Sequence, residues 1–208
     1  MKKFAHLCIS SLVLFVFNHS AGAQSYFKPS LFKINYSLST PSGNLVDFTD
    51  DFSFRGISAE YSYFFNEQFG IGGRAGFNHF FEESNGVTSE QIQIGSSTLT
   101  VSGNQFRNFT VVPVMFKATY LHTNSTLFTP YVSVGLGGIH AERSIEMGKY
   151  LIEDSGWGFG FAPEVGILID LNDILLTLSG AFNSSTGNEV IDSYAFYTLD
   201  LGLAWRFN

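Results

Sequence analysis

The chain has 208 residues, of which only 14% are charged while 16% are aromatic and 21 are glycine. Typical soluble domains carry about 25% charged residues, so a water-exposed exterior is hard to build from this composition. The formal net charge of −7 argues against a nucleic-acid partner. Beyond residue 23, no apolar run reaches the 18 or more residues of a transmembrane helix. These properties favour a secreted β-protein.

The first 23 residues have the pattern of a targeting segment. Two lysines precede an apolar run at 7–17, and Ala21 and Ala23 form the small-residue pattern of a signal-peptidase site. The sequence therefore predicts a cleaved signal peptide over 1–23 and one domain over 24–208. The single cysteine lies inside the signal, so the mature chain would have no disulfide or thiolate chemistry.

Eight stretches of alternating apolar and polar residues follow, typical of strands with two unlike faces. They cover 30–41, 53–65, 69–81, 108–121, 129–140, 157–170, 174–183 and 194–207. Their connections alternate between short (66–68, 122–126, 171–173) and long (42–52, 82–107, 141–156, 184–193). This layout predicts an all-β fold, an eight-stranded antiparallel transmembrane up-and-down barrel with three short periplasmic turns and four longer extracellular loops.

The strand phases assign charges to the barrel interior. The charges that share a strand face with small and polar residues are Lys33, Glu60, Arg74, Lys117, Glu164, Asp200 and Arg206. A lipid-facing basic residue costs about 2–4 kcal/mol at mid-membrane, so these residues are expected to face inward. An eight-stranded interior is filled by side chains, which predicts a polar lumen network, with a narrow ion or solute pathway as the alternative. Arg55 is out of phase and points outward unless a bulge at Gly56 shifts its strand.

The last strand places Leu201, Leu203, Trp205 and Phe207 on its outward face. Together with the segments PYVSVGLGG (130–138) and VVPVMFKATY (111–120), it makes the chain resemble the small outer-membrane β-barrel family, the "porin family" or OmpA/OmpW/OmpX-like proteins. The resemblance implies integral insertion in the outer membrane of a Gram-negative bacterium, with its lipids and lipopolysaccharide as partners. It also implies that these four residues form the assembly signal read by the barrel insertion machinery.

Catalytic and cofactor motifs are scarce. His79 and His140 lie near the long-loop rim with Glu82, Glu142 and Ser144, the region where barrel enzymes that modify lipid A keep their catalytic groups. The HAERS segment (140–144) does not reproduce the histidine–serine spacing of the deacylases. No metal-ligand spacing or phosphate-binding loop occurs, so no cofactor is expected. We therefore predict a non-enzymatic protein, with a rim-active lipid hydrolase or acyltransferase as the alternative. A lipocalin-like barrel would need an apolar cavity and a charged exterior, the reverse of this pattern.

The predicted loops hold 12 of the 18 acidic residues: Asp47, Asp50, Asp51, Glu82, Glu83, Glu90, Glu142, Glu146, Glu153, Asp154, Glu189 and Asp192. Loops on a rigid scaffold usually carry the binding function, so we predict an envelope-structural or surface-interaction role, with a ligand that the sequence does not name. The acids either form a solvated surface or, through Asp47, Asp50, Asp51, Glu82 and Glu83, weakly contact divalent cations that bridge to lipopolysaccharide. The 82–107 segment alternates enough to extend two strands, and its edge could pair with an incoming strand.

Overall fold

The structure, a computed structural model, describes residues 29–84, 88–94, 97–123, 127–148, 150–171 and 173–207, with the backbone alone for 88–94 and 97–102. The predicted signal peptide lies outside these residues. The strands are β1 (Ser30–Ser42), β2 (Ser53–Phe64), β3 (Phe69–Glu83), β4 (Thr88–Ile94), β5 (Ser97–Gly103), β6 (Gln105–Leu121), β7 (Phe128–Met147), β8 (Tyr150–Asp170), β9 (Leu175–Ser185) and β10 (Tyr194–Phe207). One short 3-10 helix, η1 (Gly43–Leu45), lies between β1 and β2.

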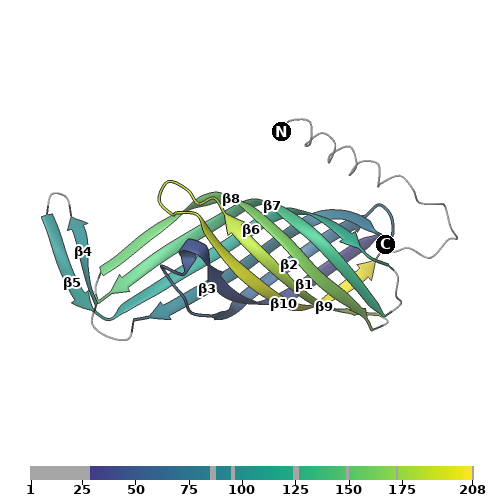
Figure 1. Cartoon of the computed structure of the whole chain (residues 1–208), viewed down its shortest axis with the longest axis horizontal. Helices are drawn as coiled ribbons and strands as arrows, with labels where there is room; N and C mark the ends of the chain where they lie inside the picture. Colours follow the sequence, from purple (N-terminus) through teal and green to yellow (C-terminus); the bar gives the residue numbers. More distant parts are fainter. Residues whose placement is uncertain are drawn as a thin grey trace, which may run out of the picture.

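Eight strands close into an antiparallel barrel in the order β1-β10-β9-β8-β7-β6-β3-β2 (Figure 1). β4 and β5 form a separate two-stranded hairpin between β3 and β6. Among the described residues, no helix is long and apolar enough to cross a membrane. The predicted eight-stranded antiparallel barrel is therefore confirmed, with an additional hairpin.

The strand alternation produces two different surfaces. Outward residues such as Ile57, Ile71 and Phe116 are exposed, the last by 83%, whereas inward residues such as Glu60 are buried. The narrow interior also explains the glycines that alternate with polar residues. A Cβ added to Gly72 would lie 2.0 Å from the Tyr61 carbonyl oxygen. Glycine therefore allows adjacent backbones to approach closely inside the barrel.

The two ends of the barrel differ. At the short-turn end, β1 and β10 start and finish together, with Ser30 opposite Phe207. Here the β2–β3 turn is fixed by Asn66, whose side-chain oxygen accepts hydrogen bonds from the backbone N–H groups of Gln68 and Phe69 at 2.9 and 2.8 Å. β6 ends and β7 begins at this same end, as do β8 and β9. The opposite, loop end carries the β1–β2, β7–β8 and β9–β10 connections and the β4–β5 hairpin.

The prediction of a long loop at 141–156 is wrong. β7 continues to Met147 and β8 begins at Tyr150, and the two strands pair over that whole extension. Gly148, which has a φ of 62°, follows β7 in a conformation that favours glycine. The prediction failed because this segment carries charged residues on both faces, which is unsuitable for a strand in lipid but acceptable for one that has left the membrane.

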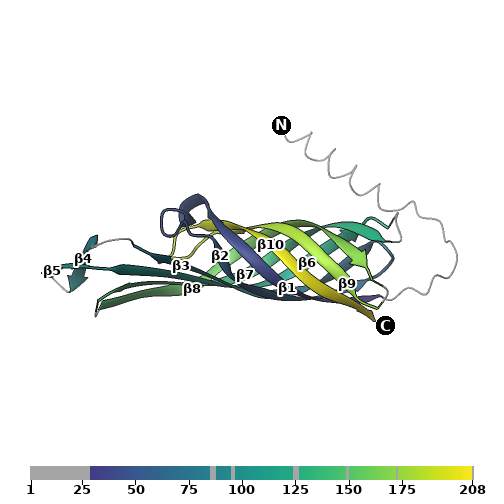
Figure 2. The ribbon, with the colours of Figure 1, turned by 90° about the horizontal axis from the view of Figure 1, so that it is seen from below.

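One side of the barrel wall is much taller than the other. β3, β6, β7 and β8 have 15 to 21 residues, whereas β9 has 11. A strand needs only about 9–11 residues to cross the membrane. β8 pairs with β9 only from Gly160 onward, so its earlier residues extend beyond the rim (Figure 2). We call these extensions the projecting wall, made of 80–83 in β3, 105–110 in β6, 141–147 in β7 and 150–159 in β8.

Arg55 points outward, as its phase indicated. The β1–β2 register shifts between Ser37, opposite Gly56, and Ser39, opposite Ser53, so two residues of β2 face one of β1. The bulge therefore lies at Phe54 and Arg55, before Gly56 rather than at it, and both side chains are exposed. Outside the barrel, the Arg55 guanidinium lies 5.6 Å from the centroid of the Phe81 ring.

Candidate functional site: lumen and loop-end mouth

An ionic layer occupies the middle of the lumen. It contains six of the seven charges predicted to face inward: Lys33, Glu60, Arg74, Lys117, Glu164 and Asp200. They come from β1, β2, β3, β6, β8 and β10, so the layer ties six strands together across the interior. All six are buried, with relative exposures of 1–6%. Three positive and three negative groups give the layer no net formal charge.

Glu164 is the hub of the ionic layer. Its Oε2 lies 3.0 Å from an Arg74 nitrogen and 2.8 Å from Lys117 Nζ, and its Oε1 lies 3.7 Å from Lys33 Nζ. The Tyr131 hydroxyl donates to the same Oε1 at 2.6 Å. Charged groups removed from water are tolerated only when paired and hydrogen-bonded in this way.

The remaining pairs complete the layer on both sides of Glu164. Glu60 receives Lys33 at 2.9 Å and Lys117 at 2.5 Å, one on each carboxylate oxygen. Asp200 pairs with Arg74 at 2.8 Å. Asp200 therefore has one cationic partner, whereas Glu60 has two and Glu164 has three.

Arg206 does not belong to this layer, contrary to the sequence prediction. It is half-buried near the end of β10, and among the described residues no ion pair joins it to the six. Its position explains the difference, because Arg206 pairs in register with Leu31 at the short-turn end, whereas Asp200 lies opposite Ser37 further inside. Its absence leaves the positive and negative charges of the layer equal in number.

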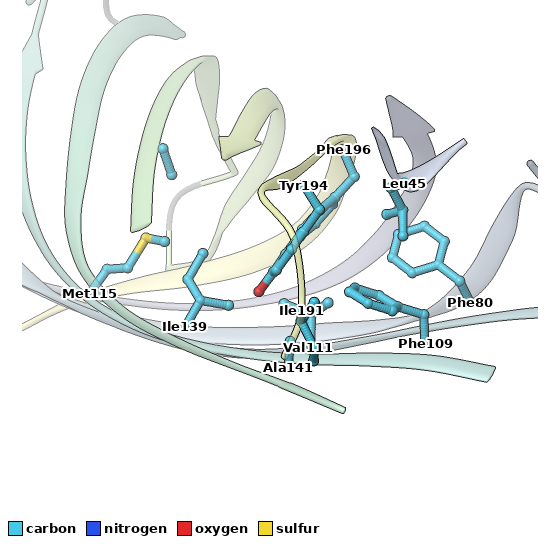
Figure 3. Packing of buried hydrophobic residues seen from close by; sticks show 11 residues of the cluster. Leu45, Phe80, Phe109, Val111, Met115, Ile139, Ala141, Ile191, Tyr194 and Phe196 are labelled. Atoms are coloured by element: carbon cyan, nitrogen blue, oxygen red, sulfur yellow. The ribbon is translucent and has the colours of Figure 1, made fainter. Parts of the chain in front are cut away.

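Two apolar clusters flank the ionic layer, but buried polar residues such as Ser62 near the short turns and Asn183 near the loops continue the predicted polar character towards both ends. The short-turn cluster contains Leu31, Phe64, Leu121, Tyr131, Leu168, Leu175 and Ala204. The loop-end cluster contains Leu45, Phe80, Phe109, Val111, Met115, Ile139, Ala141, Ala162, Ile191, Tyr194 and Phe196 (Figure 3). The inward side chains therefore include an ionic layer in the middle of the barrel, with one apolar cluster on each side of it.

Two loops cover the loop-end cluster at the mouth of the barrel. Leu45, at the end of η1, and Ile191, between β9 and β10, are both buried in this cluster. Asn44 donates a side-chain hydrogen bond to Ser193 at 3.4 Å, which joins the two loops. The inward packing of these two loops was not predicted, although the isolated apolar residues among their acidic ones are a sequence signal for it.

Phe48 anchors the first loop, 43–52, to the projecting wall. Its ring packs against Phe109, with centroids 6.0 Å apart, and the guanidinium groups of Arg107 and Arg143 lie 5.8 and 5.7 Å from its centroid. Arg107 also donates to the Phe48 carbonyl oxygen at 3.1 Å. Cation–π contacts of this kind contribute about 0.5–1 kcal/mol each at exposed sites.

A cavity of about 280 Å³ lies at this mouth. Both loops line it together with Phe109 of β6 and Arg143 of β7. We call it the mouth pocket. Its apolar side is the loop-end cluster, and its polar side includes Asp47 and Asp192, which are exposed at the surface.

The five acids proposed to contact divalent cations do not gather into one site. The Glu82 carboxylate accepts a hydrogen bond from the Asp50 backbone N–H at 2.9 Å, which joins the first loop to β3. Within the described part of the chain, no group of three or more histidine, cysteine, aspartate or glutamate residues is placed to hold a metal ion.

The two rim histidines contact neighbours other than the expected acids and serine. The His79 Nδ1 atom lies 3.0 Å from the Thr110 hydroxyl, and the His140 ring packs against Trp157 with centroids 5.2 Å apart. Among the described residues, no hydrogen bond joins His140 to Glu142 or Ser144. Within the part of the chain that the structure describes, these two histidines are therefore not joined to an acid and a serine.

The four outward residues of the last strand lie on the lipid-facing surface at the short-turn end. Leu201, Leu203 and Phe207 are exposed by 42–44%, and Trp205 is half-buried against Phe32, with ring centroids 6.3 Å apart. Aromatic residues at this level form the interfacial girdle of membrane barrels. Their role as an assembly signal stays a prediction.

Comparisons with known proteins agree with this architecture. The sequence matches the family described as outer membrane protein beta-barrel domain over residues 9–207. No curated protein matches the chain. Neisserial surface protein A (NspA) has a similar solved structure, with a TM-score of 0.60 and 12% identity, over 86% of this chain and 97% of that one.

The attachment invasion locus protein Ail of Yersinia pestis is also similar, with a TM-score of 0.52 and 13% identity, over 87% of this chain and all of that one. Ail has also been solved in complex with the heparin analogue sucrose octasulfate, with a TM-score of 0.52 and 14% identity to this chain. At such identities the likeness shows the fold alone. The family match covers nearly the whole chain, which therefore belongs to the outer membrane protein beta-barrel domain family and is an integral protein of the Gram-negative outer membrane.

Proposed function

We propose that this protein is a non-conducting, non-enzymatic barrel that acts at the cell surface through its loop end. The observation that supports this proposal is the buried ionic layer with a buried apolar cluster on each side of it. A solute would have to pass the short-turn cluster, the ionic layer and the loop-end cluster in turn. Interiors of eight-stranded barrels are just wide enough for side chains to fill, so packing of this kind leaves no aqueous channel.

The alternative of a narrow ion pathway receives less support from the same geometry. Every charge of the ionic layer has an opposite charge within 3.0 Å. An ion entering the layer would have to displace one of these partners, and leaving a buried charge unpaired costs about 3–5 kcal/mol. The ionic layer is therefore better suited to hold the barrel walls together than to conduct.

The surface role rests on the projecting wall and the β4–β5 hairpin, which extend beyond the length needed to cross the membrane. Because the outward barrel face is committed to lipid and the lumen to its own packing, the loop end is the surface left for other partners. We expect outer-membrane lipids and lipopolysaccharide to surround the barrel and the insertion machinery to assemble it. We do not expect this protein to bind a sulfated ligand like the sucrose octasulfate in the Ail complex, because the predicted loops of this chain are rich in acidic residues.

Conductance in planar lipid bilayers tests the proposal. The folded protein should give no stable nanosiemens steps, while a larger-diameter porin in the same bilayers serves as the positive control. Stable, weakly selective channels from the purified protein would contradict it. An assay for release of acyl chains from lipid A, with a known outer-membrane deacylase as control, tests the enzymatic alternative, and turnover by this protein would establish it.

A further inference from the structure

The mouth pocket has two carboxylates without a counter-charge. Asp47 from the first loop and Asp192 from the loop before β10 line the cavity. Among the described residues, neither forms an ion pair. They come from segments 145 positions apart in the sequence, and the Asn44–Ser193 hydrogen bond, at 3.4 Å, holds these segments together. The two negative charges are therefore brought to one cavity by the tertiary fold.

Among the described residues, Arg143 is the one cation that lines the pocket, and it is already neutralised. Arg143 pairs with Asp154 across the β7–β8 hairpin at 2.5 Å, and its guanidinium lies over the Phe48 ring. Among the lining residues the charge balance is thus negative, and the nearby Arg107, which does not line the pocket, donates to the Phe48 carbonyl oxygen. An anionic ligand would meet two uncompensated carboxylates, whereas a cation would be attracted by them.

The apolar side of the pocket is aromatic. The Phe109 and Tyr194 rings meet edge to face with centroids 5.0 Å apart, and Phe48 packs against Phe109 from the first loop. Aromatic ring faces carry partial negative charge and attract cations. The protein itself uses this property beside the pocket, where two guanidinium groups lie within 6 Å of the Phe48 centroid.

We propose that the mouth pocket binds a small organic cation, an alkylammonium group whose charge is held by Asp47 and Asp192 and whose apolar part contacts the aromatic side. The cavity, about 280 Å³, is at the lower limit of ligand pockets, so one compact headgroup fits better than an extended molecule. The exposed acids Asp50, Asp51 and Glu189 nearby would raise the local concentration of cations by long-range attraction. This inference deepens the proposed surface function by naming a ligand class for the loop end.

Calorimetric titration of the folded protein in detergent micelles with choline tests the inference. The matched control ligand is 3,3-dimethylbutan-1-ol, which has the shape of choline without the charge. Choline should bind saturably at one site, more weakly as salt is added, and at least about tenfold more tightly than the neutral alcohol. Equal binding of the two ligands, or no saturable binding of choline, would overturn the proposal.

Matched substitutions separate the pocket from diffuse surface charge. Asp47→Asn and Asp192→Asn should each weaken choline binding about fivefold, the effect of losing one charge at contact distance in a solvated site. Asp51→Asn and Glu189→Gln remove exposed acids of the same two loops that do not line the pocket, and should change binding less than twofold. Equal losses in all four variants would mean general attraction by the acidic surface and would refute the pocket.

The outcome is separable from that of the proposed function. Unheated gel mobility, which reports barrel folding, should be the same for all four variants and the parent. If choline does not bind and bilayers show no conductance, the pocket inference fails while the non-conducting surface role stands. If choline binds and stable channels appear, the pocket inference stands while the non-conducting role fails.

Discussion

The ionic layer and the loop-end cluster fill the same barrel but depend on different kinds of sequence position. Every member of the ionic layer lies on a strand, and each makes directional contacts of about 3 Å with oppositely charged neighbours. The loop-end cluster adds Leu45 and Ile191 from loops and is held by shape and apolar burial. Removing one partner of a buried charge pair lowers the unfolding free energy sharply, because the other charge is left unpaired. Removing apolar volume lowers it in proportion to the size of the cavity that is left.

The sharpest way to test this difference is to remove the hub of the ionic layer. Glu164→Gln leaves three cations facing two carboxylates, and a broken buried pair costs about 3–5 kcal/mol. We expect this variant to lose that amount of unfolding free energy in urea, followed by the fluorescence of the two tryptophans in lipid vesicles. Asp200→Asn, which removes a carboxylate with a single cationic partner, Arg74, should cost less. If both variants unfold at the parent's urea concentration, the layer is solvated and does not hold the barrel together.

A smaller effect is expected from trimming the loop-end cluster. Ile139 is fully buried there, and Ile139→Val removes one methyl group, which typically costs about 0.5–1.5 kcal/mol. Ile57→Val makes the same change on the lipid-facing surface, where the side chain is 56% exposed, and should cost less than Ile139→Val. The same urea titration compares the two variants. A larger loss for Ile57→Val would show that the loop-end cluster is not tightly packed.

Within the membrane, the sequence was sufficient to place most strands and the inward charges. Each strand has one face towards lipid and one towards a narrow interior. The strand phase and the cost of a charge in lipid therefore sufficed to assign Glu60, Lys117 and Glu164 to the lumen. Arg206 has the phase of an inward residue but lies nearer the short-turn end than the ionic layer. Alternation predicts the face on which a residue lies, but not its neighbours across the barrel. The pairing within the ionic layer depends on strand register, which the pattern does not contain.

Strand residues outside the membrane do not face lipid, so the alternation of apolar and polar residues no longer identifies a strand there. Residues 141–147 continue β7, but Glu142 and Glu146 place charges on one face and Arg143 on the other, so the sequence pattern indicated a loop. The inward packing of Leu45 and Ile191 depends on contacts between segments far apart in the chain. The mouth pocket was missed for this reason, since Asp192 was assigned only to an acidic surface and Asp47 to that surface or to weak divalent-cation contacts.

The smallest stability effect is expected from removing the β4–β5 hairpin, although it extends furthest from the barrel (Figure 1). Its strands pair only with each other, and the chain ends that it joins are adjacent, with the Ser84 N–H donating to the Gln105 carbonyl at 2.9 Å. A short Gly-Ser linker in place of 85–103 should therefore close without strain and change the unfolding free energy by less than about 1 kcal/mol.

The matched control is removal of residues 146–151 at the tip of the β7–β8 hairpin, which takes away Met147, a side chain buried to 2% exposure. Because the projecting wall packs mainly against itself, while the β4–β5 hairpin is a separate sheet that contacts β7 only near its base, this shorter deletion should destabilise the barrel more than the longer one. Urea unfolding in vesicles compares the two. If the hairpin deletion proves the more damaging, β4 and β5 support the wall, and the division between a packed wall and an independent hairpin is wrong.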